Sequence, residues 1–346
     1  IARRQRQMCI RDSYKAACCF ASRYYLFMQD WDNAIKYATM ALTSNPSSLL
    51  RDYSAIAALP NGTSRHQEYV NSASTANFLL QAATSNSGLL FDWYSTAGRY
   101  SHGKLQGIYE TVQPKKGGPW GSSVTFKAPH AVLASSGKYV LPRTWRVFQY
   151  TDPVAGTGFN KAISVLFTSE EALLNRAEAY IMKMNEDPTA LDKALEDINL
   201  YAANLFSAGF KSMTEASIIK WATETYPDYS ELYVGKTSVS SPQTLNPKKK
   251  LHAAPYNTLE EGGPQESMLQ ALIFMRRYQF LHEGMRWFDT RRFGITVYRY
   301  LLDEDAETVV QITDQISDEN GTADPRRALQ LPADVIAAGL TPNPRK

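Results

Sequence analysis

Apolar residues at helical spacing dominate the first fifty positions of the chain. From Tyr14 onward, apolar side chains recur at steps of three and four residues, which is the period of one face of an α-helix. Asp30 is a suitable N-cap for a second helix, whose apolar face includes Ala34 and Ala41. The pattern therefore predicts two helices within residues 14–46. For the first helix it predicts one shared face that holds Tyr14, Ala17, Cys18, Ala21, Tyr25 and Met28.

Two further helical segments are predicted downstream. Residues 168–206 carry two apolar stripes separated by the turn at 185–188, so they form a second helical pair. Ser169, which two glutamates follow, is the expected cap of its first helix. Residues 265–293 form a long helix, an interruption at Gly284, and a short aromatic and basic helix.

The small residues along the first helical pair match the later part of a tetratricopeptide pattern, in which two antiparallel helices approach closely. We therefore expect a mainly α fold, built as a tetratricopeptide-like scaffold of helical pairs with long irregular loops and little β structure. One β-like run, residues 308–312, lies in the C-terminal segment 294–346.

Residues 91–150 differ from the rest of the chain. They hold eleven aromatic side chains in sixty positions and show no helical period. Long irregular segments in compact domains are usually functional or disordered, and so high an aromatic content argues against disorder. This aromatic loop region is therefore a candidate binding surface.

Composition excludes several classes of protein. The net charge is +3, from 37 basic and 34 acidic residues, and no long basic stripe suggests nucleic-acid binding. No stretch approaches the ~18 apolar residues of a transmembrane helix. Cys9, Cys18 and Cys19 offer neither a disulfide framework nor the spacing of metal ligands. We expect Cys18 and Cys19 to be buried thiols.

Residues 1–13 require a separate interpretation. The run Met8–Ser13 back-translates to a string that resembles a transposase-end sequencing adapter. We interpret residues 1–13 as translated adapter sequence and leave them out of the fold prediction. On this interpretation the natural N-terminal part lies upstream, although a natural basic arm is the alternative.

Three segments together resemble the SusD/RagB family. Thr168–Tyr180 resembles the family's "LLRAEAY" helix, Arg276–Arg292 its "EG.RWFDLRR" segment, and Leu331–Ile336 its terminal "IP..EI" motif. The first helical pair is similar to the family's tetratricopeptide scaffold. The three motifs occur in the family's order, and the resemblance covers residues 14–346 as one SusD-like domain.

The sequence departs from the family pattern in two places. Met275 and Gln279 stand where the pattern usually has glutamate, which predicts a weaker ion network on the surface of that helix. The family's N-terminal part, with its signal peptide and lipid-anchoring cysteine, has no counterpart here. Cys9 is not that cysteine, because no hydrophobic region precedes it.

The resemblance implies a lipoprotein at the cell surface of Bacteroidota-type bacteria. Such a protein serves polysaccharide utilisation: it binds an oligosaccharide or polysaccharide and passes it to a TonB-dependent, SusC-like outer-membrane transporter. It is not an enzyme, needs no cofactor or metal, binds no nucleic acid, and meets the membrane only through its lipid anchor. Some family members bind other nutrients.

Aromatic rings suit sugars because the C–H groups of a pyranose pack on a ring face, while its hydroxyl groups need polar partners. Trp120 lies in a Gly-Gly-Pro-Trp-Gly turn, which we expect to expose its indole. The alternative is that these aromatic residues fill a loop core over the helices, as we expect for Trp145. The stacking candidates are Trp93, Tyr94, Tyr100 and Trp120, and the polar candidates are Asp92, Arg99 and Lys116.

Residues 283–292 are expected to be structural. Trp287 and Phe288 should anchor the helix end in the core, and the charged residues nearby should pair with one another. An anionic-ligand site at Arg291 and Arg292 is the alternative.

Two rival functions remain open. A tetratricopeptide-type protein-interaction module without glycan binding would fit the helical pairs. A glycan-degrading enzyme would need two carboxylates that face one cleft, a geometry that a sequence neither shows nor excludes. Glu170 and Glu171 are explained by helix capping, and no histidine pair has the spacing of a metal site on a helix.

Overall fold

A computed structural model describes residues 2–90, 118–121, 124, 127, 132–133, 138–139, 147–206, 209–224, 248–302, 309–318 and 324–345. For residues 2–13, 89–90, 132–133, 138–139, 300, 302 and 309–312, the description covers the backbone alone.

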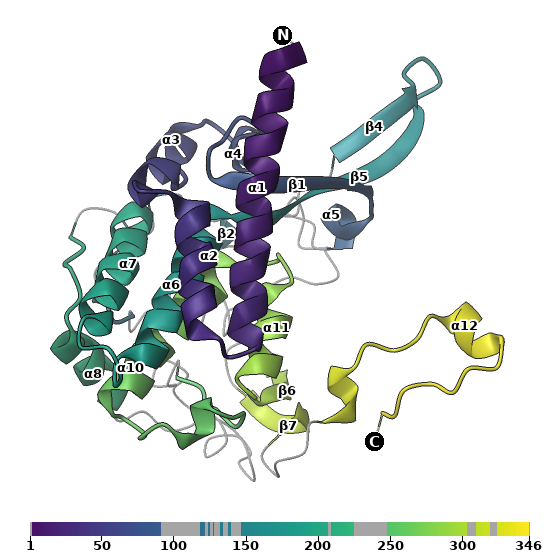
Figure 1. The fold of residues 1–346 in the computed structure, drawn as a ribbon. Helices are drawn as coiled ribbons and strands as arrows, with labels where there is room; N and C mark the ends of the chain where they lie inside the picture. The colour runs from purple at the N-terminus through teal and green to yellow at the C-terminus, as the bar shows by residue number, and fades with distance from the viewer. Residues whose placement is uncertain are drawn as a thin grey trace.

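The described chain is mainly helical, as the sequence predicts (Figure 1). The α-helices are α1 (Ala2–Phe27), α2 (Trp31–Leu42), α3 (Tyr53–Ala58), α4 (Gly62–Tyr69), α5 (Ser87–Leu90), α6 (Ser169–Lys183), α7 (Ala190–Leu205), α8 (Glu215–Thr223), α10 (Pro264–Gln279), α11 (Met285–Arg292) and α12 (Ala333–Ala337). The 3-10 helices are η1 (Pro46–Leu49), η5 (Tyr256–Thr258) and η6 (Pro325–Arg327). The strands are β1 (Asn77–Thr84), β2 (Val132–Leu133), β3 (Lys138–Tyr139), β4 (Val147–Asp152), β5 (Thr157–Thr168), β6 (Val297–Leu302) and β7 (Val309–Ile316).

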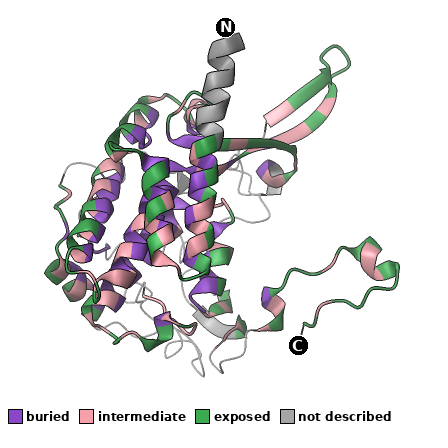
Figure 2. Ribbon diagram, viewed as in Figure 1, coloured by how far each residue is buried: buried purple, intermediate pink, exposed green. Residues whose placement is uncertain are grey.

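Helix α6 is the centre of the scaffold. It packs against α1, α2, α7 and α10, so the predicted helical pairs α1–α2 and α6–α7 lie side by side. Its stripe of Leu173, Leu174, Ala177 and Ile181 is fully buried. Figure 2 shows buried residues along the facing sides of these helices. The core therefore sits between the helical pairs.

The buried face of α1 differs from the predicted one. Tyr14 and Met28 are exposed, whereas Ala16, Cys19 and Leu26 are buried. Small side chains at the contact allow α1 to approach α2 and α6 closely, which turns most of its aromatic residues outward. Cys18 and Cys19 are both buried free thiols, as predicted.

The helix termini agree in part with the prediction. Asp30 caps α2 by accepting a hydrogen bond from the backbone N–H of Asn33, as expected. The cap of α6 is Thr168 and not Ser169, because the Thr168 hydroxyl accepts from the N–H of Glu171. Helix α1 begins at Ala2, within the segment that we left out of the fold prediction. The adapter interpretation of residues 1–13 stays a prediction.

A three-stranded antiparallel sheet in the order β1-β5-β4 was not predicted. Strand β5 pairs with β1 from Thr168 back to Lys161, and with β4 from Lys161 back to Thr157. The β4–β5 hairpin extends away from the helices (Figure 1). The β-like run at 308–312 is confirmed in part, since β7 begins at Val309 and pairs with β6.

Candidate functional site

The two long motif segments of the SusD/RagB resemblance meet in a buried ion network. Arg292 of α11 donates hydrogen bonds to Glu178 of α6, with 2.8 Å between Nη2 and Oε2. Asp289, one turn earlier on α11, pairs with Arg276 of α10 at 2.9 Å. All four side chains are buried. The network therefore joins α6 to the neighbouring helices α10 and α11, which lie about a hundred residues further along the chain.

The electrostatics of this network favour the charged form of the Asp289 carboxyl. Burial acts to raise the pKa of the Asp289 carboxyl, but the charges of Arg276 and Arg292 outweigh it and hold that pKa below its ordinary value. Burial raises the pKa of Tyr256, whose hydroxyl donates to Glu178. This chemistry stabilises a scaffold, and it makes Arg292 a structural residue, as predicted.

The expectation for Phe288 needs correction. Phe288 is 43% exposed and does not anchor the helix end in the core. The hydrogen bonds to the Asp289 carboxylate come from Arg276 and Arg292, whereas Glu283 accepts one from the Tyr69 hydroxyl. The sequence showed the charges but not which residues they would meet.

The two glutamates at the start of α6 do more than cap a helix. Glu171 forms a bidentate pair with Arg23 of α1, at 2.6 and 2.7 Å. Glu170 lies 3.7 Å from the guanidinium of Arg51 and accepts a hydrogen bond from its backbone N–H. Both glutamates are buried. They connect α6 to segments more than a hundred residues away, so the capping explanation was incomplete.

Met275 and Gln279 were expected on a helix surface, but both are buried. Oε1 of Gln279 accepts hydrogen bonds from the hydroxyls of Tyr53 and Tyr201, at 3.2 and 3.0 Å. An uncharged amide therefore fits this position better than an ionised glutamate would.

Trp120 is also buried, with 6% of its surface exposed, so the expectation of an exposed indole was wrong. Its ring stacks on Phe274, with centroids 5.2 Å apart and planes 2° apart, and it contacts Phe206 at 4.5 Å. A Cβ at Gly118 would lie 2.5 Å from the indole, so the ring folds back over a position where only glycine fits. For Trp120 the alternative of a loop core is correct.

The other predicted site residues fall outside the part of the chain that the structure describes. They are Asp92, Trp93, Tyr94, Arg99, Tyr100 and Lys116, and Trp145 joins them. Their proposed contacts with glycan stay predictions.

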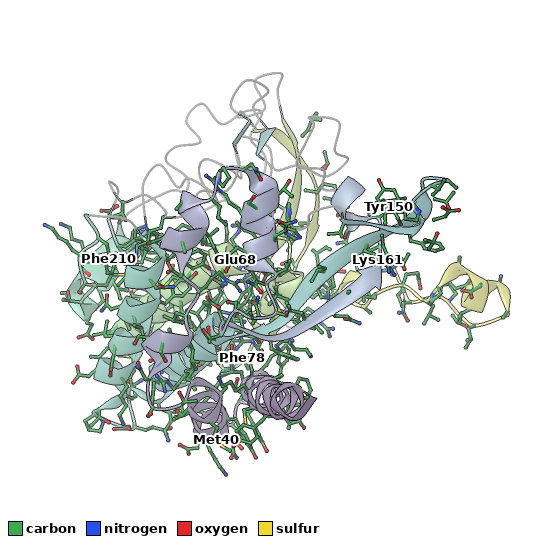
Figure 3. All side chains as sticks on the ribbon, turned by 90° about the horizontal axis from the view of Figure 1, so that it is seen from above. Met40, Glu68, Phe78, Tyr150, Lys161 and Phe210 are labelled. Atoms are coloured by element: carbon green, nitrogen blue, oxygen red, sulfur yellow. The ribbon has the colours of Figure 1, made fainter. Side chains whose placement is uncertain are left out.

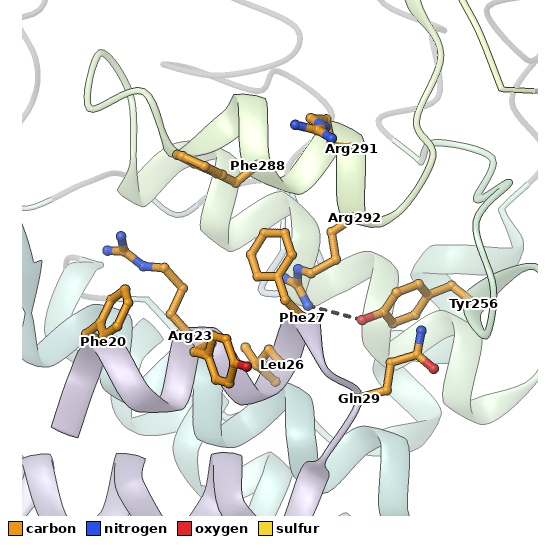
Figure 4. A pocket seen from close by; sticks show the side chains of 10 residues that line it. Phe20, Arg23, Leu26, Phe27, Gln29, Tyr256, Phe288, Arg291 and Arg292 are labelled. Atoms are coloured by element: carbon orange, nitrogen blue, oxygen red, sulfur yellow. Dashed lines mark hydrogen bonds between the residues drawn. The ribbon is translucent and has the colours of Figure 1, made fainter. Parts of the chain in front are cut away.

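An open aromatic pocket lies between α1 and α11 (Figure 4). It has a volume of about 610 Å³, within the range of small-ligand sites. Four of its aromatic rings are about half exposed: Phe20, Tyr24, Phe27 and Phe288. The complete lining is Phe20, Arg23, Tyr24, Leu26, Phe27, Gln29, Tyr256, Phe288, Arg291 and Arg292.

Most polar groups of the α1–α11 pocket already have partners. Arg23 is held by Glu171 and Arg292 by Glu178, while the Tyr256 hydroxyl donates to the same glutamate. Figure 4 shows the hydrogen bond that Arg292 donates to the Tyr256 hydroxyl. Arg291 is exposed and has no ion pair among the described residues. An oligosaccharide needs many hydrogen-bonding partners, so the pocket suits an apolar protein surface better than a sugar.

The described residues contain no group of three or more histidine, cysteine, aspartate or glutamate side chains placed to hold a metal ion. Within the same part of the chain, no helix has the length and apolar character needed to cross a bilayer.

Comparison with solved structures finds a match to a crystal structure of a SusD-like protein from Bacteroides fragilis. The two chains share 14% sequence identity and superpose with a TM-score of 0.40. The match covers 95% of this chain and 64% of that one, so this chain spans less than two thirds of the length of its match. No protein-family model and no curated protein matches the sequence.

Proposed function

We propose that this protein captures an oligosaccharide outside the bacterial cell and passes it to a TonB-dependent, SusC-like transporter. The proposal depends on one observation above all. The two long segments that resemble the SusD/RagB family contact each other through the buried pairs Glu178–Arg292 and Asn175–Arg276. Segments that matched by chance would have no reason to meet in one network.

The buried network also indicates where the binding surface is not. The four ionic residues of this network are enclosed and pair with one another, so they hold the scaffold and leave the ligand to other side chains. They are Glu178, Arg276, Asp289 and Arg292. The aromatic loop region is the strongest sequence candidate. Within it, Trp93, Tyr94 and Tyr100 would stack on sugar rings, and Asp92, Arg99 and Lys116 would bind hydroxyl groups. Trp120 does not belong to this set, because it is buried in the core.

On this proposal the protein is a lipoprotein of the outer membrane, held there by a lipid anchor. It binds its ligand without chemical change. Hand-over requires that bound sugar can leave, so stacking and hydrogen bonding suit the task better than a covalent step.

Calorimetric titration of the purified 346-residue chain with a panel of neutral and acidic oligosaccharides tests this function. Trp93→Ala should weaken the binding of the best ligand by ~5–150-fold, as expected for a buried aromatic anchor. Tyr14→Ala, which removes a half-exposed ring from α1, should leave the affinity unchanged. Unchanged affinity in Trp93→Ala would eliminate that residue from the site, and shortened sugar products would favour the glycan-degrading enzyme.

The α1–α11 pocket favours a second candidate function, a protein-interaction module. Its half-exposed rings could receive the apolar face of a partner helix. In that case the chain would bind no oligosaccharide, and Phe288→Ala would weaken a protein complex. Binding of sugar that Phe288→Ala leaves intact would favour glycan capture.

A further inference from the structure

The β4–β5 hairpin carries exposed aromatic rings on both of its faces. Tyr150 is 58% exposed and Phe159 is 55% exposed. Figure 3 shows Tyr150 far from the helical core, with Lys161 nearer to the base of the hairpin. A single exposed ring is normal on a protein surface, whereas rings that gather into a patch indicate a binding surface. The two faces differ in what surrounds each ring.

Strand register assigns the side chains to faces. Residues opposite each other in an antiparallel pair point to the same face, and successive residues alternate. Phe148 is opposite Asn160, and Tyr150 is opposite Gly158, so one face holds these four residues. Phe159, opposite Gln149, lies on the other face.

The first of these faces carries a pair of rings. Phe148 and Tyr150 meet edge to face, with centroids 4.9 Å apart and planes at 75°. A Cβ at Gly158 would lie 2.1 Å from the carbonyl oxygen of Gln149, so no other residue fits there. The position opposite Tyr150 therefore contributes no side chain, which leaves its ring open to a ligand.

Two amides lie next to the rings. Nδ2 of Asn160 donates to Oδ1 of Asn86 at 3.0 Å. The Nδ2 group of Asn86 donates to no atom of the described residues. Oδ1 of Asn160 is buried and accepts no hydrogen bond from them, so Asn160 holds Asn86 in place and does not itself face a ligand. The face thus presents aromatic surface beside the unused donor of Asn86. The other face has the single ring of Phe159, on which no other described ring packs.

We propose that Phe148, Tyr150 and Asn86, the last held in place by Asn160, form a subsite for one neutral pyranose unit of a bound oligosaccharide. The C–H face of the sugar would pack on Tyr150, and a hydroxyl group of the sugar would accept a hydrogen bond from Nδ2 of Asn86. The four hairpin residues of this face carry no charge, which favours a neutral sugar over an acidic one. The proposal rests on the proposed function.

The position of the subsite agrees with the predicted aromatic loop region. Asn86 directly precedes α5, which packs on β5. Helix α5 ends at Leu90, so the chain enters the aromatic loop region from beside this sheet. A glycan longer than one unit could therefore contact the hairpin and the loop region together.

Two single variants on opposite faces of the hairpin test the subsite. The probes are maltohexaose, cellohexaose, xylohexaose, mannohexaose and laminarihexaose, titrated into the purified full chain by calorimetry. Tyr150→Ala should weaken the best-bound hexaose by about 5–30-fold. Phe159→Ala is the matched control, since it removes a ring of nearly equal exposure, and it should change the affinity less than twofold. Tyr150→Phe should retain most of the affinity, because the ring remains.

The outcomes separate the subsite from the function. Suppose that wild type binds a hexaose, that Trp93→Ala weakens this binding, and that Tyr150→Ala does not. The subsite is then refuted and the proposed function stands. Equal losses in Tyr150→Ala and Phe159→Ala would also refute the subsite, because they would show a general effect on the hairpin. Failure of wild type to bind any oligosaccharide, in these probes or in the larger neutral and acidic panel, would refute both proposals.

Discussion

Glu178→Gln is the sharpest test of the buried ion network. The Glu178 carboxylate is fully buried and accepts hydrogen bonds from Arg292 and from the hydroxyl of Tyr256, at 2.8 and 3.2 Å respectively. The substitution keeps the size of the side chain but removes its charge. Among the described residues, the buried guanidinium of Arg292 would then have only Asp289 as an ion-pair partner, at 3.4 Å.

The expected loss follows from leaving a buried charge without its main partner. Breaking such a pair costs about 3–5 kcal/mol, whereas an exposed pair contributes about 0–1 kcal/mol. Unfolding entropy of ~2.1 cal/mol/K per residue gives ~0.7 kcal/mol/K for 346 residues, so Tm should fall by about 4–7 °C.

Urea denaturation followed by circular dichroism measures this loss. Lys193→Gln is the control, because Lys193 and Asp187 form an exposed pair at 3.7 Å, and it should cost less than about 1 kcal/mol. At temperatures below the unfolding transitions of both proteins, Glu178→Gln should bind sugar with the affinity of wild type, because the network supports only the scaffold. A stability loss no larger than that of Lys193→Gln would refute the structural role of the network.

Three further predictions concern groups whose surroundings the structure defines. Trp120→Ala should lower the free energy of unfolding by about 3–5 kcal/mol, because it removes a buried ring that packs on Phe274. A loss of less than about 1 kcal/mol in urea denaturation would place Trp120 outside the core. Asp289→Asn should be less stable than wild type at pH 7, and this difference in the free energy of unfolding should become smaller by pH 3. The lowered pKa of Asp289 gives stability that is present above the unfolded pKa of ~3.9 and is lost as pH falls through the folded pKa. A difference in stability that grows on acidification would contradict this prediction. In a Cys9→Ser variant, Cys18 and Cys19 should resist Ellman's reagent until urea is added, because both are buried and burial raises the pKa of each thiol. Rapid labelling of the folded protein would contradict their burial.

Local patterns predicted the longer helices α2, α6, α7 and α10, because each depends on residues near one another in sequence, but they did not predict the shorter helices α3, α4 and α8. The stripe Leu173–Ile181 and the cap Asp30 needed no information from the rest of the chain. The sheet did not follow from such patterns. Strand β5 pairs with β1 across a long separation in sequence, and its burial alternates irregularly, so neither a clean period of two nor a hairpin turn marks the β1–β5 contact.

The individual residues that were predicted wrongly are those whose contacts lie far away in the sequence. A Gly-Gly-Pro-Trp-Gly turn can direct an indole outward or inward, and Phe206 and Phe274 are what make Trp120 a core residue. Glu170 looked like a capping residue because its partner Arg51 is 119 positions away. The hairpin rings Phe148 and Tyr150 were part of the aromatic loop region, and their spacing of two residues was the available signal for a shared face.

The central claim is that the protein binds an oligosaccharide and releases it unchanged. Calorimetric titration of the full chain with the hexaose panel, followed by chromatography of the recovered sugar, measures both parts of the claim. The account predicts saturable binding of at least one hexaose, with the sugar recovered at full length. Shortened products would contradict the claim of unchanged release, and the absence of binding across neutral and acidic oligosaccharides would contradict the claim of capture.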